Sequence, residues 1–181
     1  MTGIRCFVAV ELPLHMREEI GRLQSRIATD GLRLVRPELV HITIKFLGEL
    51  PLEKVGQVSE ALGRIKAAPF PVQVIGMGAF PGRSVRVVWL GLTGNFQELY
   101  QKVELALEPL GFSPEARGFS PHVTLGRVAR PDAEMNRKLG TKIANFSSLD
   151  LGSFTVDRFY LKKSTLTQGG PIYEDLAGFP L

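Results

Sequence analysis

The sequence has 181 residues, a length that favours a single domain. Its 22 Lys and Arg against 18 Asp and Glu give a formal net charge of +4, which favours an anionic partner. The basic residues form no tail of the kind that binds nucleic acid as an extended arm. Cys6 is the only cysteine, which excludes an internal disulfide. No export signal or spanning apolar helix is present, so we expect a cytoplasmic protein without membrane contact.

The first half of the chain predicts a strand, a helix, a second strand and a second helix. A strand is expected at 4–12, and the helix that begins at Pro13 ends near Gly31, since glycine is typical of a helix C-terminus. The next strand stops at Gly48, and Pro51 suits the first turn of the next helix. Apolar residues at helical spacing support both helices: Met16, Ile20, Leu23 and Ile27, then Leu52, Val55, Val58, Leu62 and Ile65.

The second half predicts a similar alternation of strands and helices. The expected elements are strands at 70–79 and 84–92, a helix with Phe96, Leu99, Val103, Leu107 and Leu110 on one face, a loop at 111–121, a strand at His122, a helix near 131–140, and strands at 152–162 and 171–176 around Gly169 and Gly170. This pattern predicts an α+β fold with two lobes, in which helices lie outside and sheets line a central cleft.

One three-residue motif, His-x-Thr, occurs twice, and each copy lies in an apolar run that predicts a strand. The copies are His41-Ile42-Thr43 and His122-Val123-Thr124, and they contain two of the three histidines in the chain. Because side chains alternate along a strand, each histidine shares a face with its threonine while the middle residue turns toward the core. Two such strands side by side would gather two imidazoles and two hydroxyls around one small volume.

This set of groups suits cleavage of a phosphate ester. One proton has to leave the attacking oxygen and another has to reach the departing oxygen. Histidine titrates near neutral pH, so one ring can act as base while the other acts as acid. Threonine hydroxyls can donate hydrogen bonds to the phosphoryl oxygens, where negative charge accumulates.

The residues around both motifs resemble a known superfamily. Residues 36–48 and 119–127 are similar to the two signatures of the two-histidine (2H) phosphoesterases, and among these the chain most resembles the RNA 2′,3′-cyclic phosphodiesterases, formerly called 2′-5′ RNA ligases. The likeness extends to 5–13, to 80–81 and 86–91, and to 161–166 and 170–173. It implies one phosphoesterase domain over 1–181, with two mainly antiparallel sheets and a pseudo-two-fold internal duplication that supplies one His-x-Thr strand from each lobe.

The resemblance also implies an activity and residue roles. The expected reaction is hydrolysis of RNA 2′,3′-cyclic phosphate ends to 2′-phosphates, with His41 as general acid and His122 as general base. Thr43, Thr124 and Arg127 would bind the phosphate. No cofactor and no obligatory protein partner are implied.

Four further residues are candidates for contact with RNA: Lys45, Phe46, Lys163 and Ser164. Lys45 is in phase with His41, whereas Phe46 and Arg127 have the opposite parity. Arg127 therefore reaches the site only if Gly126 marks a bulge or the end of the strand. Each of these residues also has a purely structural reading, as a solvated charge, an exposed strand end or, for Phe46, a core residue.

The sequence lacks the motifs that are typical of other kinds of catalytic or binding site. There is no Cys/His cluster or His-x-His, which argues against a tightly bound metal, and no phosphate-binding Gly-Lys-Ser/Thr loop. Three alternatives remain open. The substrate could be a small cyclic phosphate, such as ADP-ribose 1″,2″-cyclic phosphate, or a 2′-5′ linkage; the enzyme could perform nucleotide-independent 2′-5′ ligation; or the chain could be an RNA-end binding module with little turnover.

Overall fold

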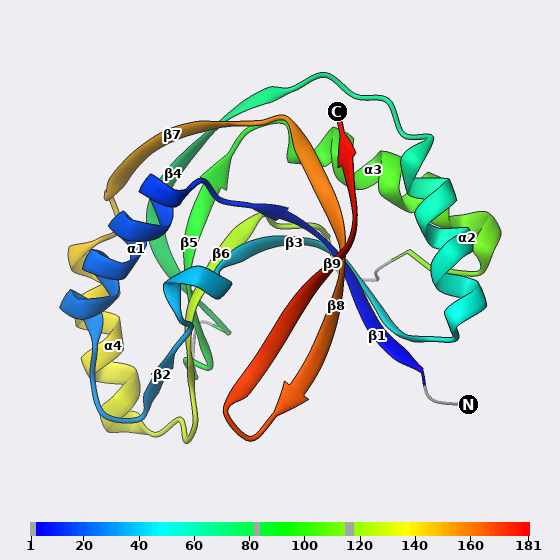
Figure 1. Ribbon diagram of the computed structural model, residues 1–181. Helices are drawn as coiled ribbons and strands as arrows, with labels where there is room; N and C mark the ends of the chain where they lie inside the picture. Colours follow the sequence, from blue (N-terminus) through cyan, green and yellow to red (C-terminus); the bar gives the residue numbers. More distant parts are fainter. Residues whose placement is uncertain (1–2, 82–83, 115–117) are drawn as a thin grey trace.

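The computed structural model describes residues 3–81, 84–114 and 118–181 (Figure 1). The strands are β1 (Ile4–Glu11), β2 (Leu32–Leu34), β3 (His41–Leu50), β4 (Phe70–Phe80), β5 (Val87–Thr93), β6 (His122–Val128), β7 (Asp150–Val156), β8 (Arg158–Thr167) and β9 (Gly170–Pro180). The helices are α1 (Leu14–Ile27), α2 (Leu52–Gly63), α3 (Phe96–Leu107) and α4 (Ala133–Asn145), with short 3-10 helices η1 (Pro37–Leu39) and η2 (Glu108–Leu110).

The strands form one curled antiparallel sheet rather than two separate sheets. Its order is β7-β4-β5-β6-β3-β1-β8-β9, and β2 pairs with β6 outside this path. Strands β7, β4, β5 and β6 make one half, and β3, β1, β8 and β9 make the other. Within the described residues, the halves pair through Ile42 of β3 and Val123 of β6. The α+β class and the antiparallel pairing are confirmed, and the two expected sheets are the two halves of this one.

Two helices cover each half of the sheet. Helix α1 contacts β7 and α4 contacts β4, whereas α3 contacts β3 and α2 contacts both α3 and β9. Figure 1 shows α1 and α4 together at one side of the molecule and α2 and α3 together at the other. Helix α1 follows β1, and α3 follows β5, so each of these helices packs on the half to which its preceding strand does not belong. This exchange ties the two halves into one body.

The apolar stripes predicted for the helices are largely buried. The stripe of α1 is buried throughout. That of α3 is buried up to Leu107, whereas the predicted Leu110 lies in η2 and is only partly buried, and Leu52 in the first turn of α2 is exposed. The side chain of Asp132 caps α4 by accepting a hydrogen bond from the Met135 backbone N–H at 2.7 Å. Within the described residues, none of the helices has the length and apolarity needed to cross a membrane.

Several elements differ from their predicted bounds, among them the last strand, which is Gly170–Pro180 rather than 171–176. The expected strand at 152–162 is in fact two strands separated at Asp157, of which β7 pairs with β4 and β8 pairs with β1, at opposite ends of the sheet. Helix α4 is longer than predicted, and the three-residue β2 was not predicted at all. In the expected loop at 111–121, residues 115–117 lie outside the described residues.

Candidate active site

The pairing of β3 with β6 brings the two His-x-Thr motifs together. Ile42 and Val123 are partners and are fully buried, as alternation predicts for the middle residue of each motif. In the antiparallel register around this pair, His41 lies across from Thr124, and Thr43 lies across from His122. These four side chains are all partly exposed and lie on the face opposite the core.

The two histidines therefore occupy a diagonal of this square. Diagonal neighbours on one face of an antiparallel pair are roughly 7–8 Å apart at the backbone. A tetrahedral phosphate fits between two imidazoles at that separation, with a threonine hydroxyl on either side. The arrangement can therefore place a general acid on one side of a phosphorus atom and a general base on the other.

The two imidazoles are held by the same local hydrogen bond. Nδ1 of His41 donates to the Leu39 carbonyl at 2.8 Å, and Nδ1 of His122 donates to the Ser120 carbonyl at 2.8 Å. A carbonyl can only accept, so Nδ1 carries the proton in each neutral ring and Nε2 is left for chemistry. In His41, Nε2 lies 3.1 Å from Oγ1 of Thr43.

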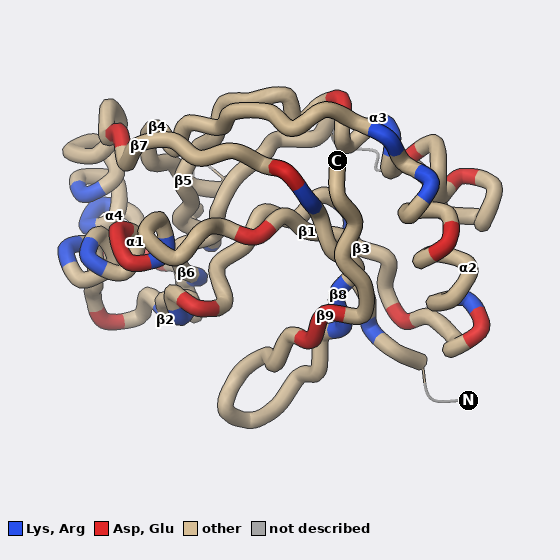
Figure 2. The backbone as a smooth tube through the Cα atoms, turned by 45° about the horizontal axis from the view of Figure 1, so that its top comes forward, with Lys and Arg blue, Asp and Glu red and all other residues tan. Residues whose placement is uncertain are grey.

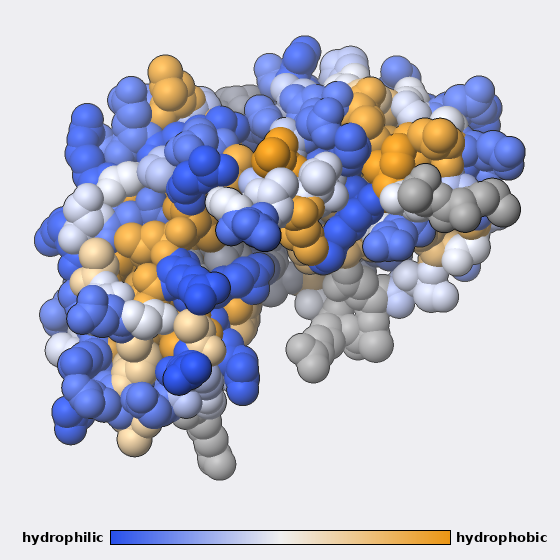
Figure 3. Space-filling model, turned by 60° about the horizontal axis from the view of Figure 1, so that its bottom comes forward, coloured by the Kyte–Doolittle hydropathy of each residue, from blue (hydrophilic) through white to orange (hydrophobic). Residues whose placement is uncertain are grey.

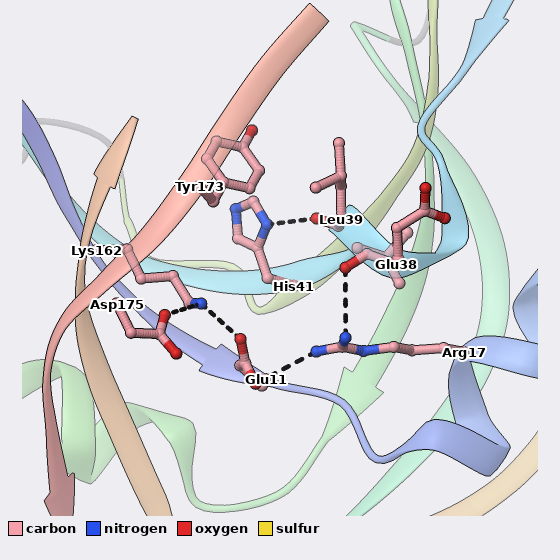
Figure 4. Close-up of a pocket in the computed structure, with 9 residues that line it drawn as sticks. Glu11, Arg17, Glu38, Leu39, His41, Lys162, Tyr173 and Asp175 are labelled. Atoms are coloured by element: carbon pink, nitrogen blue, oxygen red, sulfur yellow. Dashed lines mark hydrogen bonds and ion pairs between the residues drawn. The ribbon is translucent and has the colours of Figure 1, made fainter. Parts of the chain in front are cut away.

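A cavity of about 170 Å³ adjoins His41 (Figure 4). An ion-pair network forms one wall, in which the Lys162 ammonium contacts the carboxylates of Glu11 and Asp175. Arg17 extends the network through a 3.4 Å contact with Glu11. Figure 4 shows this network below the imidazole of His41. These charged groups lie far apart in the sequence, and no motif predicted that they meet at the site.

This environment changes the acidity of His41. Burial lowers the pKa of His41 below its ordinary value, and the cationic Lys162 and Arg17 act in the same direction. The hydrogen bond to Leu39 and the carboxylate of Glu11 oppose that shift but are weaker than burial. Without a bound anion, His41 is thus biased toward its neutral form.

Aromatic rings pack against both histidines. The ring of His41 lies 5.0 Å from Phe7 and 5.2 Å from Tyr173, and the ring of His122 lies 5.2 Å from Phe80. These contacts support the orientations that the hydrogen bonds to backbone give the imidazoles. On the face of the molecule drawn in Figure 3, apolar residues form patches bordered by hydrophilic ones.

A β-bulge follows the motif in β6. Consecutive residues of β5 pair with Thr124 and Gly126, which leaves Leu125 as an extra residue. The buried amide of Gln24 donates a hydrogen bond to the Leu125 carbonyl at 3.0 Å. Alternation reverses at this point, so Arg127 is exposed on the face of His122, as its predicted role requires.

A matching bulge follows the motif in β3. Consecutive residues of β1 pair with Thr43 and Lys45, which leaves Ile44 as the extra residue. Phe46 therefore takes the position that Arg127 has in β6, and it is 58% exposed. Its placement fits a contact with substrate, and the core-packing alternative is wrong.

The bulge also displaces Lys45, which the sequence placed in phase with His41. That expectation is wrong, because Lys45 is 2% exposed and turns toward the core side. Its ammonium donates to Glu104 at 2.7 Å and to the Ser113 carbonyl at 3.0 Å. Lys45 thus joins β3 to α3 and is not available to RNA.

The two candidates in β8 lie on different faces. Ser164 pairs with Tyr173, whose ring contacts His41, so Ser164 lies on the face of the site. Lys163 points to the opposite face and forms an ion pair with Glu174 at 2.7 Å. On the site face, the lysine that approaches His41 is Lys162.

Arg127 lies within electrostatic range of the other half of the site. Burial raises the pKa of the Tyr173 hydroxyl, while the positive charge of Arg127 acts in the opposite direction. Tyr173 contacts His41, so Arg127 and His41 face the same space from opposite halves of the sheet. Within the described residues, no group of three or more His, Cys, Asp or Glu has an arrangement that could hold a metal ion.

Comparison with known proteins agrees with this geometry. The family described as LigT like Phosphoesterase matches residues 10–89 and 91–173, and each segment contains one His-x-Thr strand. RNA 2′,3′-cyclic phosphodiesterases of Methanocaldococcus jannaschii and Archaeoglobus fulgidus are similar to this chain. The M. jannaschii protein is 36% identical, over 94% of this chain and 97% of its own length. The A. fulgidus protein is 37% identical, over 97% of this chain and 99% of its own length.

Solved structures give the same result. The crystal structure of Escherichia coli LigT in its apo form has a TM-score of 0.80 at 27% identity, covering 100% of this chain and 99% of that one. A Thermus thermophilus structure has a TM-score of 0.82 at 28% identity, covering 98% of this chain and 97% of that one. The matched family segments span most of the sequence and contain both motifs, and on this ground the chain belongs to the LigT-like phosphoesterases of the two-histidine superfamily.

Proposed function

We propose that this protein hydrolyses RNA 2′,3′-cyclic phosphate ends to 2′-phosphates by acid–base catalysis between its two histidines. The observation that carries the proposal is the diagonal placement of His41 and His122 on one face of β3 and β6, with Nδ1 of each ring bonded to backbone. The relatives named RNA 2′,3′-cyclic phosphodiesterase support the choice of substrate. The chain would act as one cytoplasmic domain to which each half contributes one strand.

In the proposed reaction, water attacks phosphorus on the side opposite the 3′ oxygen. Nε2 of His122 takes the proton of the attacking water as the new P–O bond forms. The P–O3′ bond breaks, and His41 delivers its Nε2 proton to the departing O3′. Thr43, Thr124 and Arg127 hold the phosphoryl oxygens as negative charge builds on them.

The acid role requires protonated His41 in the substrate complex. Burial and nearby cations favour the neutral ring in the free protein. A bound phosphodiester places a negative charge beside Nε2, which raises the pKa of the ring. Binding of the substrate would thus load His41 with the proton that it later transfers.

The proposed mechanism requires neither a metal ion nor a nucleotide triphosphate. Two histidines supply both proton transfers, and the threonines and Arg127 supply charge stabilisation. Turnover should therefore be unchanged after exhaustive treatment with EDTA. Loss of turnover that added divalent ions restore would contradict the metal-independent mechanism.

The deciding experiment compares a cyclic-ended oligonucleotide with cyclic mononucleotides, ADP-ribose 1″,2″-cyclic phosphate and a 2′-5′-linked dinucleotide. We expect turnover of the cyclic-ended oligonucleotide, with a 2′-phosphate end as the product. Faster turnover of a small cyclic phosphate or of the 2′-5′ linkage would assign a different substrate. Binding without turnover would identify an RNA-end binding module, and joining of two RNA ends would identify a ligase.

A further inference from the structure

The short strand β2 places a second arginine beside Arg127. In the antiparallel pairing of β2 with β6, Arg33 is the direct partner of Arg127. Direct partners point to the same face of a sheet, with their Cβ atoms about 4.5–5.5 Å apart. The flanking partners Leu32 and Val128 are buried on the core face, so both arginines extend from the face of the active site.

This pair of cations is not neutralised within the described residues. Neither Arg33 nor Arg127 forms an ion pair or a side-chain hydrogen bond there, whereas Arg17, Arg22 and Lys162 all contact carboxylates. Like charges directly opposite each other destabilise a sheet. Figure 2 shows basic positions around β2 and β6. A bound anion would remove this repulsion.

The backbone at this point is shaped to keep β2 close to β6. A Cβ added at Gly126 would lie 3.0 Å from the carbonyl oxygen of Arg33, so a glycine permits this close pairing. The Val35 N–H donates to the Leu125 carbonyl at 2.9 Å, which joins the segment after β2 to the bulge of β6. The same bulge turns Arg127 toward the site.

We propose that Arg33 binds the phosphodiester on the 5′ side of the terminal nucleotide of an RNA substrate, next to the scissile phosphate at Arg127. This inference rests on the function proposed above. A phosphodiester carries a single negative charge, so two adjacent guanidinium groups match two successive phosphates of a chain better than one cyclic phosphate. Arginine suits this role because its planar donors bind phosphate oxygens in pairs.

The proposal makes a phosphate on the 5′ side of the terminal nucleoside the group that Arg33 recognises. A nucleoside 2′,3′-cyclic phosphate with a free 5′ hydroxyl has no group for Arg33. The same compound with a 5′-phosphate, or a cyclic-ended dinucleotide, has one. Arg33 would thus favour RNA ends over small cyclic phosphates at a site whose catalytic groups act on both.

The test measures kcat and KM of wild-type protein and Arg33→Ala on these three substrates. We expect KM to rise about tenfold on the two substrates that carry a 5′ phosphate, the scale of one charge-assisted hydrogen bond, with kcat little changed. Neither parameter should change on the 5′-hydroxyl compound. Arg33→Lys should recover part of the loss, because it keeps the charge without the paired donors.

Arg64→Ala is the matched control, since Arg64 is an exposed arginine at the C-cap of α2 whose partner is Glu60. It should leave KM unchanged on all three substrates. An equal loss for Arg33→Ala on every substrate would place Arg33 at the scissile phosphate, and no loss on any would remove it from the site; both outcomes overturn the inference. Failure of the wild-type protein to turn over any of them would instead overturn the proposed function.

Discussion

His41 and His122 make the same hydrogen bond to backbone but differ in their electrostatic surroundings. Only His41 adjoins the network of Lys162, Glu11 and Asp175. Two copies of one motif have thus been placed in different environments, which can give one ring the role of acid and the other that of base. This difference provides a test of the roles that does not depend on the symmetry of the motifs.

The first prediction concerns the pH dependence of Lys162→Met. The change removes a cation that lowers the pKa of His41 and takes the ammonium partner away from Glu11 and Asp175, so the pKa of His41 should rise. An acid has to be protonated, and kcat/KM reports the free enzyme, so its alkaline limb should move to higher pH. Rate measurements from pH 5 to 9 would show the shift.

Lys163→Met is the control, because Lys163 lies on the opposite face and pairs with Glu174. Both limbs of its pH profile of kcat/KM should stay in place. Lys162→Arg should retain most of the wild-type pH profile. Movement of the acid limb in Lys162→Met would make His41 the base. A profile without any shift would contradict electrostatic coupling between Lys162 and His41.

A second prediction assigns the roles through the leaving group. A substrate whose 3′ leaving group is much more acidic needs little protonation. His41→Ala should then recover much of its lost rate, whereas His122→Ala should remain defective, because water still needs its base. The opposite pattern would exchange the two roles, and rescue of neither variant would contradict a separate acid step.

At the scale of elements, the two bulges decide which side chains reach the site. Strict alternation predicted that each histidine shares a face with its threonine, and the structure agrees. Alternation fails three residues after each histidine, because one extra residue in each strand reverses the parity. The reversal exposes Phe46 and Arg127 and buries Lys45. Gly126 gave a signal for one bulge, whereas no glycine marks the bulge at Ile44 in β3.

Gly78 supplies a prediction about packing beneath His122. A Cβ at Gly78 in β4 would overlap the ring of Trp89, whose centroid is 6.5 Å from that of His122. Gly78→Ala should therefore lower the free energy of unfolding by about 1–3 kcal/mol, as overpacking does. Denaturant unfolding would measure the loss.

Gly140→Ala offers a matched comparison, because nothing lies within 4 Å of a Cβ at Gly140 in α4. There alanine should raise the stability by about 0.5–1 kcal/mol, through helix propensity. Equal effects at both positions would show that contact with Trp89 is not what requires glycine at position 78.

At the scale of the molecule, two halves of one sheet share a single site. The sequence predicted the two lobes and the strand that each contributes. It did not predict that 150–167 separates at Asp157 into strands at opposite ends of the sheet, because local pattern carries no information about pairing partners. The meeting of the charged groups around Lys162 was not predicted for the same reason, since they come from β1, α1, β8 and β9.

The central claim is that His41 from one half and His122 from the other act on one phosphate. The most direct measurement is the single-turnover rate of His41→Ala, His122→Ala and the double variant on a cyclic-ended oligonucleotide. Each single variant should lose at least roughly 100-fold, and the double variant should be little worse, because each change disables the same concerted step. A single variant with a near-normal rate, or losses that multiply in the double variant, would contradict the shared two-histidine site.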